Sequence, residues 1–498
     1  MLASGPGGPD QSLGIWTISV VGGQSRKIRD DAWLATPSPD GSLVAFISAD
    51  YREIWLIKSN GEEPRRLAAV EAGATFFQVA WSPDGQRLAY LKTYSLESKR
   101  QIESCDLDGT HTSLIWSDQR LKNFCWTSRG RIIATLSESQ AGGPSRSNLW
   151  ALDVQAVRPT SPKQLTRFAG FTPFSLSVTA DGKQLALVRN YDQSDVYVGD
   201  LEANGARLSA PRRLTLDDRV DWPGGWTRDS KALLFYSDRS GTLDIYRQKP
   251  ADRTPELLLA GSDEKRQPQV SPDGASVVYL AWPKMSGDAL PAAGKVMFFP
   301  LAGGPPQFVL DAKGYPGSAQ TPRELGTRVL TTAGHPDIRC PRLAGSSCVL
   351  SETEPGKVIF SSLDTGNGKR TQLIAVEAGP SSFWDLSPDG SRIALGEIGR
   401  NDRIRILPLA GGESRKIPVK DFRLVASVGW SADGASLFLT GTAPEGGSII
   451  RHLFPDGRSQ LLYKADAWLE RPLASPDGRS LAFGQATSSN NVWTIENF

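Results

Sequence analysis

The sequence predicts an all-β fold, a β-propeller, and two observations lead to that prediction. First, a short apolar strand runs nine times into the turn Ser-Pro-Asp-Gly, or a close variant, and then into a second apolar strand. Second, a third strand that alternates apolar and polar residues follows, and a short fourth strand with basic residues closes the unit. Four strands per unit at a repeated period are typical of propeller blades.

The turn itself explains the period. Proline presets the first corner of a hairpin, aspartate caps its own backbone, and glycine takes the left-handed conformation. The third turn residue serves as a marker, and the spacings between markers are 44, 45, 52, 48, 44, 116, 44 and 44 residues. The markers are Asp40, Asp84, Arg129, Asp181, Asp229, Asp273, Asp389, Asp433 and Asp477. The widest gap is about two periods, and residues 329–377 have the strand content of a unit without its marker turn.

The remaining strands follow in order along each unit. The expected third strands are residues 53–58, 147–153, 195–201, 242–248 and 403–409. The expected fourth strands are residues 65–67, 163–165, 212–214, 371–373 and 415–417, whose basic side chains suit an exposed outer edge. Four tryptophans directly before the turn are expected to pack between blades: Trp81, Trp126, Trp226 and Trp430.

The two chain ends suggest how the ring closes. Residues 14–20 and 25–28 are expected to be third and fourth strands without a hairpin before them, and the last unit stops after its third strand, residues 491–496. Pairing an N-terminal strand into the C-terminal blade closes a ring without an open edge. We therefore predict one continuous array over residues 1–498, of about ten four-stranded blades, with no separate catalytic domain. Because ten blades exceed the common four to eight, two consecutive smaller propellers are the alternative.

Two segments carry a family resemblance. Residues 81–85 read Trp-Ser-Pro-Asp-Gly, and residues 236–246 begin Tyr-Ser-Asp-Arg-Ser-Gly and end Asp-Ile-Tyr. They resemble the TolB-type, WD40-like propeller repeats of bacteria, and the similarity covers nearly the whole chain. The irregular segment with Cys340 and Cys348 and the C-terminal residues 491–498 are similar to propeller regions that follow serine/threonine kinase or winged-helix domains in bacterial regulatory proteins. The resemblance implies a sensor or interaction role and no catalytic one.

Composition argues against two classes of partner. The chain has 56 Lys and Arg against 54 Asp and Glu, so no field gathers polyanions, and nucleic acid is not an expected partner. No apolar run approaches the ~18 residues of a membrane helix, and residues 1–12 lack the regions of a secretory signal. Direct membrane insertion is therefore not expected. We expect an extracytoplasmic or periplasmic location if the chain is part of a larger membrane-tethered protein, and a cytoplasmic one otherwise.

Catalytic, metal and cofactor motifs are not found in the sequence. There are three histidines, no Cys-x-x-Cys pair and no Gly-x-Ser-x-Gly nucleophile elbow, so neither a cofactor nor a metal is expected and the protein is predicted not to be an enzyme. Cys340 and Cys348 are eight residues apart, a spacing that allows a disulfide across a hairpin. Cys105 and Cys125 are expected to be small buried hydrophobes.

The candidate binding site is the entry to each innermost strand, because loops from all blades converge at a propeller's channel mouth. Counting back seven residues from each marker gives Trp33, Phe77, Lys122, Phe174, Trp222, Arg266, Ser382, Ala426 and Glu470. Their charged neighbours are Asp31, Arg120, Asp221, Glu264 and Arg471. Aromatic and arginine anchors are typical of protein-recognition surfaces. The alternative interpretation is that the aromatics plug the ring or pack between blades.

These observations predict a non-enzymatic propeller that binds a protein or peptide, as a sensor or scaffold module of a bacterial regulatory or envelope system. One alternative is a glycan or small-molecule sensor that uses the same aromatics as stacking platforms. The other is a hydrolase or lyase acting through paired channel carboxylates ~5 to 10 Å apart. Its candidate residues are Asp31, Asp221, Glu264 and Glu470.

Overall fold

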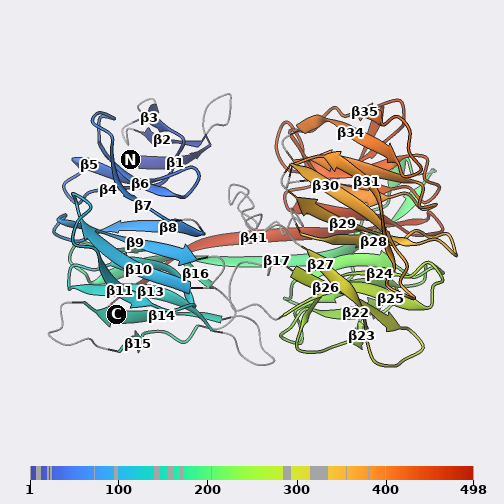
Figure 1. The fold of residues 1–498 in the computed structure, drawn as a ribbon, viewed down its shortest axis with the longest axis horizontal. Coiled ribbons are helices and arrows are strands. Elements are labelled where there is room, and N and C mark those ends of the chain that lie inside the picture. The colour runs from blue at the N-terminus through green and yellow to red at the C-terminus, as the bar shows by residue number, and fades with distance from the viewer. Residues whose placement is uncertain are drawn as a thin grey trace. The chain divides into compact units, whose positions relative to one another are not determined.

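The computed structural model confirms the all-β class. It describes residues 2–6, 13–18, 22, 25–71, 73–94, 99–138, 146–154, 161–168, 172–203, 205–283, 293–313, 335–354, 356–379, 382–398, 400–496 and 498. In these ranges the strands form antiparallel sheets, most of them four-stranded (Figure 1). Across the same ranges, no helix is long and apolar enough to cross a membrane.

The chain folds as two compact units. Unit 1 comprises Met1–Gln140, Ser145–Tyr191 and Ser489–Phe498, and unit 2 comprises Ala141–Pro144 and Asp192–Ser488. The expected single ring is therefore replaced by two smaller bodies, as in the alternative prediction, but they are not consecutive because unit 2 is inserted into unit 1. The reason is the length of two strands, since β17 (Gln184–Glu202) and β41 (Ser480–Glu496) each contribute residues to both units.

Unit 1 is a series of sheets whose first strands contact one another, β4 with β1 and β8, and β12 with β8 and β16. The sheets are β1–β3, β4–β7, β8–β11, β12–β15, and β16 with the unit 1 parts of β17 and β41. The strands are β1 (Leu2–Pro6), β2 (Leu13–Thr17), β3 (Arg26–Asp30), β4 (Ala32–Pro37), β5 (Leu43–Ser48), β6 (Glu53–Lys58), β7 (Arg65–Ala69), β8 (Ala74–Trp81), β9 (Arg87–Tyr94), β10 (Lys99–Asp106), β11 (Ser113–Ser117), β12 (Leu121–Trp126), β13 (Arg131–Glu138), β14 (Arg146–Asp153), β15 (Lys163–Gln164) and β16 (Thr172–Val178).

The expected closure by an N-terminal strand is wrong. Strands β2 and β3 pair with β1 in a sheet of their own, whereas the C-terminal strand β41 lies between β40 and β17. The physical reason is that β41 continues for 17 residues without a turn and finds its antiparallel partner in β17. At one end Leu201 donates its amide to the Arg479 carbonyl (2.7 Å), and at the other Gln184 bonds Glu496 (3.3 Å).

Unit 2 is a closed ring. In the part of unit 2 that the structure describes, six blades are present: β20–β23, β24–β27, β28–β31, β32–β35, β36–β39, and a sixth made of β40, β41, β17 and β19. Among the innermost strands, β20 contacts β24 and β40, β24 contacts β28, and β36 contacts β32 and β40. An ion pair between Arg339 and Asp385 (3.4 Å) joins β28 to β32 and completes the circle.

The other strands of unit 2 are β18 (Arg207–Leu208), β19 (Arg212–Arg213), β20 (Asp221–Trp226), β21 (Leu233–Ser237), β22 (Asp244–Gln248), β23 (Glu256–Leu259), β24 (Glu264–Val270), β25 (Ser276–Trp282), β26 (Ala293–Pro300), β27 (Gln307–Lys313), β28 (Asp337–Arg339), β29 (Cys348–Glu354), β30 (Lys357–Leu363), β31 (Arg370–Glu377), β32 (Ser382–Leu386), β33 (Arg392–Glu397), β34 (Arg400–Pro408), β35 (Arg415–Pro418), β36 (Leu424–Trp430), β37 (Leu437–Thr442), β38 (Ser448–Leu453), β39 (Ser459–Ala465) and β40 (Trp468–Ala474). Strands β28–β31 are the unit that was predicted without its marker turn. Residues 329–334 of that prediction lie outside the described ranges.

The marker turns hold themselves together, as predicted. Asp273 accepts hydrogen bonds from the Ser271 hydroxyl (2.5 Å) and from the Ala275 amide (3.0 Å), and these bonds lower its pKa. The serine or threonine bond recurs at Asp40, Asp84, Asp181, Asp229, Asp389, Asp433 and Asp477. Each aspartate is thus engaged by its own hairpin.

Tryptophans tie each blade to its neighbour. The indole N–H of Trp81 donates to the Thr36 carbonyl (3.1 Å), and that of Trp226 to the Leu473 carbonyl (3.0 Å). Trp430 makes the equivalent bond to the Asp385 carbonyl (3.2 Å). Because each acceptor lies on the innermost strand of an adjacent blade, the predicted packing between blades is confirmed for these three.

Candidate functional site

The channel of unit 2 is shaped by bulges in its innermost strands. The register shifts between Arg266 and Gln269 on β24 and between Glu470 and Leu473 on β40. Inside these bulges Gln267 and Arg471 have φ values of 54° and 51°, a left-handed backbone that costs a non-glycine residue ~1–3 kcal/mol. The two side chains meet, because Gln267, with its amide turned to satisfy both neighbours, accepts from Arg471 (3.3 Å) and donates to Asp337 (2.7 Å).

Two cavities follow one another along this channel. The entry cavity has room of about 60 Å³ for water-sized molecules and is lined by residues that include Asp337, Ser382, Ala426, Trp468 and Glu470. The turn-end cavity has about 90 Å³ and is lined by residues that include Arg228, Arg339, Arg342, Asp385 and Trp430. Gly224, Arg339, Asp385 and Leu473 line both, so they mark the boundary between the cavities.

Arg339 organises that boundary. Its guanidinium pairs with Asp337 and, at 3.4 Å, with Asp385, and it lies 5.5 Å from the centre of the Trp384 ring. Asp385 also accepts a hydrogen bond from the Trp430 amide (2.9 Å). Burial nevertheless raises the pKa of Asp385 above its usual range, against the opposing effect of Arg339.

Glu470 is a second acid of the entry cavity whose pKa is raised. Burial raises its pKa to about 7, although Arg471 and a hydrogen bond from Trp222 act in the opposite direction. The side chain is 8% exposed. Glu470 is therefore partly protonated near neutral pH and can act as a hydrogen-bond donor or as an acid.

In the described part of unit 2, four buried polar atoms without a hydrogen-bond partner lie on or just before the first residues of innermost strands. Three are nitrogens, Arg266 Nε, His335 Nδ1 and Trp468 Nε1, and the fourth is the acceptor Asp221 Oδ2. Arg266 is held by an ion pair to Glu264 (2.7 Å), which uses a different guanidinium nitrogen. Burial, with a smaller effect of Arg266, lowers the pKa of His335 to about 4, so the imidazole is neutral at physiological pH. Arg266 and Trp468 lie near the starts of β24 and β40, and His335 lies two residues before β28.

The predicted site residues are divided between the two units. Asp31, Trp33, Phe77 and Phe174 belong to unit 1, whereas Asp221, Trp222, Glu264, Arg266 and Glu470 belong to unit 2. Trp222 is buried and stacks on Tyr236 with ring centres 5.3 Å apart, and Phe77 packs against the core between two blades of unit 1. The contacts of these two aromatics agree with the alternative interpretation, in which the aromatics pack inside or between blades. Asp31 is exposed, Trp33 is half-buried, and the Phe174 side chain lies outside the described part of the chain.

Two of the candidate carboxylates are engaged by arginines. Asp221 is fully buried and pairs with Arg239 (2.9 Å), and burial raises its pKa to about 6. Glu264 pairs with Arg266 as described above. Asp221 shares the Arg239 guanidinium with Asp217 (3.2 Å). Glu470 shares the entry cavity with Asp337 and Asp385, which both pair with Arg339.

Sequence reasoning missed Asp337, Arg339, His335 and Asp385. The first three belong to the blade without a marker turn, where counting back from a marker is impossible. Asp385 had a detectable signal, because it lies four residues before its marker, where the other units have Thr, Ala, Cys, Ser, Gly, Gln, Gly and Leu. Asp385 is the charged residue among these equivalent positions, and this exception indicates that it faces the channel.

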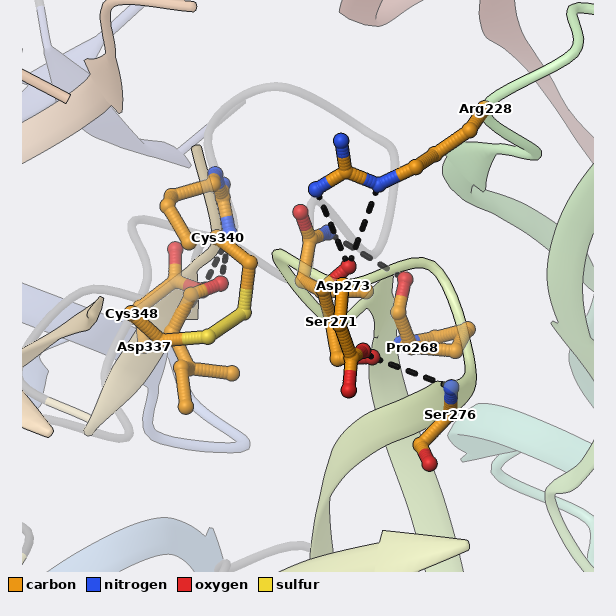
Figure 2. Close-up of a disulfide and its surroundings, with 11 residues drawn as sticks. Arg228, Pro268, Ser271, Asp273, Ser276, Asp337, Cys340 and Cys348 are labelled. Atoms are coloured by element: carbon orange, nitrogen blue, oxygen red, sulfur yellow. Dashed lines mark hydrogen bonds and ion pairs between the residues drawn. A yellow bond between two sulfur atoms is a disulfide. The ribbon is translucent and has the colours of Figure 1, made fainter. Parts of the chain in front are cut away.

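The cysteines and the other histidines have structural roles. Cys340 and Cys348 form the predicted disulfide (Figure 2), whereas Cys105 and Cys125 are free and buried. His452 is buried between Phe438 and Phe454 and bonds the Ser436 hydroxyl and the Gly205 carbonyl. Among the residues that the structure describes, no group of three His, Cys, Asp or Glu side chains is placed to hold a metal ion.

Comparison with known proteins gives limited matches. No family model matches the chain. Tricorn protease homolog 1 of Streptomyces coelicolor is 25% identical over 265 residues, which are 50% of this chain and 23% of that protein. The chain thus matches less than a quarter of that relative's length. TolB from Acinetobacter baumannii aligns with 73% of this chain and 81% of its own at 14% identity (TM-score 0.38). Oligogalacturonate lyase from Vibrio parahaemolyticus aligns with 75% and 85% at 10% identity (TM-score 0.30).

Proposed function

We propose that the propeller of unit 2 is a non-enzymatic binding module that takes a segment of a protein or peptide at the entry end of its channel. The observation that carries the proposal is the set of buried atoms without a partner there, Arg266 Nε, His335 Nδ1 and Trp468 Nε1. Leaving a buried polar group unbonded costs about 1–3 kcal/mol, and a ligand that supplies acceptors recovers that cost. Arginine and tryptophan are also the residues that most often anchor protein interfaces.

A sensor or scaffold role in a bacterial regulatory or envelope system is the form of this function that we propose. The resemblance of the repeats, such as residues 81–85, to TolB-type propeller repeats supports it. The ion pairs of Asp221 with Arg239 and of Glu264 with Arg266 favour binding over chemistry, because both carboxylates already have a cationic partner.

The test compares Arg266 with a matched arginine. The full chain is immobilised, incubated with bacterial extract, and the retained protein is identified and its affinity measured by calorimetry. Arg266→Gln should weaken binding about tenfold or more, and Trp468→Phe, which keeps the ring but removes the N–H, should weaken it several-fold. Arg247→Gln is the control, because Arg247 forms the same kind of pair with Glu256 (2.7 Å) on the outer strands β22 and β23.

Equal binding by wild type, Arg266→Gln and Arg247→Gln would contradict the proposal. If added oligosaccharides, and not peptides, release the retained ligand from the immobilised chain, the glycan-sensor alternative is favoured. Wild type, Arg266→Gln and Arg247→Gln serve for this competition as well.

One observation favours a second candidate function, a hydrolase or lyase. Glu470 is buried with a pKa of about 7, which is the tuning expected of a general acid. It shares the entry cavity with Asp337, so a second carboxylate is near. Wild type and Glu470→Gln would be incubated with peptide and oligosaccharide mixtures. Product formed by the wild type and lost in the variant, with cooperative urea unfolding showing that the variant is folded, supports the enzyme. The absence of turnover by the wild type would contradict it.

A further inference from the structure

The turn-end cavity is surrounded by arginines. Arg228, Arg339 and Arg342 line it, and among its lining residues the one acid is Asp385. Asp385 is already bonded by Arg339 and by the Trp430 amide. The wall therefore carries more positive than negative charge, and its one carboxylate is engaged.

Two of the three arginines have no carboxylate in contact. Arg342 donates to the Ala474 carbonyl (2.7 Å) and, at 3.5 Å, to the Ser475 carbonyl. Arg228 donates to the Ser271 carbonyl at 3.3 and 3.4 Å and to the Arg342 carbonyl (Figure 2). Within the described ranges neither forms an ion pair within 4 Å, so Asp385 and Asp477 act on Arg342, and Asp273 on Arg228, only at longer range. Burial outweighs these carboxylates and lowers the pKa of both guanidinium groups.

The backbone around Arg342 is fixed. The residue lies in the segment between Cys340 and Cys348, whose disulfide closes the hairpin between β28 and β29. Its amide donates to the Pro388 carbonyl of the next blade (2.8 Å). Cys340 itself lines the cavity. The guanidinium is thus held at the end of the channel by a covalent loop and by bonds to two other blades.

We propose that the turn-end cavity of unit 2 binds a small oxyanion, a carboxylate or phosphate group, through Arg228 and Arg342. Each guanidinium has five N–H donors, and the carbonyls of Ser271, Ala474 and Ser475 occupy only part of them. Planar arginine donors match the oxygens of carboxylate and phosphate. The site lies at the opposite end of the channel from the proposed peptide site and does not depend on it, because a free ion can occupy it.

The test uses acetate, inorganic phosphate and acetamide as probes on the full chain, at constant ionic strength set with sodium chloride. Acetamide has the shape of acetate without its charge. We expect acetate or phosphate, but not acetamide, to raise the urea midpoint in a saturable manner. Arg342→Gln should weaken the affinity measured by calorimetry at least about tenfold, and Arg228→Gln should weaken it in the same direction. The stronger of the two anions identifies the group that the site prefers.

The control is Arg458→Gln, because Arg458 is 82% exposed and pairs with Asp456 on the surface. Phosphate stabilises proteins generally, so the difference between this variant and the channel variants is the readout. Equal responses in Arg458→Gln, Arg342→Gln and Arg228→Gln would overturn the proposal, as would the absence of any saturable effect in the wild type. If Arg342→Gln fails to fold, Arg228→Gln alone decides.

Discussion

Two kinds of connection join the innermost strand to the second strand of a blade in unit 2. In five blades it is the marker turn, a few exposed residues that satisfy their own hydrogen bonds, as Asp273 does with Ser271 and Ala275. In the blade β28–β31 it is the longer segment from Cys340 to Cys348, closed by a disulfide. The first kind is self-sufficient, whereas the second reaches into the channel.

The difference between the two kinds of connection distinguishes residues that stabilise the fold from residues that line the candidate site. The hydrogen bonds of the marker turn are nearly the same in each blade because its chemistry is local, and these bonds carry no ligand preference. Arg228, which stands where the intact turns have Pro, is a departure from the repeat and lines the turn-end cavity. The blade that lost this turn supplies Asp337, Arg339 and Arg342, which line the two cavities. Residues that depart from the repeat therefore indicate the position of the candidate site more clearly than the repeated residues do.

The largest effect that tests this comparison is the dependence of stability on pH that the buried acid Glu470 of the channel wall should cause. The folded-state pKa of Glu470 is about 7 against its usual value of 4.5, so the folded state holds the proton more tightly than the unfolded chain. The contribution of Glu470 to stability should therefore fall by about 3 kcal/mol as the pH rises from 4.5 to about 7. Asp221 adds a change of the same sign and His335, with its lowered pKa, a change of the opposite sign, so the difference between wild type and Glu470→Gln isolates the Glu470 contribution.

Urea unfolding at several pH values between 4.5 and 8 measures this fall. In Glu470→Gln most of it should disappear, because the amide does not titrate. The turn variant Asp273→Asn should keep the fall, since the pKa of Asp273 is lowered and its titration acts in the opposite direction. If stability changes with pH in the same way in wild type and Glu470→Gln, Glu470 does not contribute the predicted pH dependence, and the channel wall does not differ from the turns in this respect.

The next effect concerns the disulfide that replaces a marker turn. Removing a cross-link that spans eight residues should cost about 2.5 kcal/mol, because the unfolded chain regains the freedom that the short loop denied it. The measurement is the urea midpoint of Cys340→Ser/Cys348→Ser, or of wild type with a reductant. The free cysteines Cys105 and Cys125 provide the control, because the variant in which both are replaced by Ala keeps the disulfide and should lose the same stability on reduction as the wild type. An unchanged midpoint on reduction would mean that the loop holds its shape without the bond.

The smallest effect is expected at the marker turns. Asp273→Ala and Asp433→Ala each remove the same bonds to a serine hydroxyl and a backbone amide, worth about 1 kcal/mol together. Urea unfolding should give equal losses for the two variants, and neither should alter anion or peptide binding. Unequal losses, or a change in binding, would break the interpretation of these turns as interchangeable.

The sequence by itself determined the features whose partners are close along the chain. The hairpin turns, the alternating third strands, the tryptophans between blades and the Cys340–Cys348 pair were all predictable, because a turn, a strand period and a short loop are local. The candidate site was predicted only in part. Arg266 and Glu470 lie at the channel of unit 2, but Trp222 is buried, and Trp33 belongs to the other unit.

Only the tertiary structure decided which strands share a blade and which charges meet. β17 and β41 alternate like other strands, and nothing local to either marks the other as its partner. The contacts of Arg339 with Asp385 and of Gln267 with Arg471 likewise join different blades. Such contacts depend on how many blades close a ring and where each bulge turns its side chains, and both are set by packing between blades that are distant in sequence.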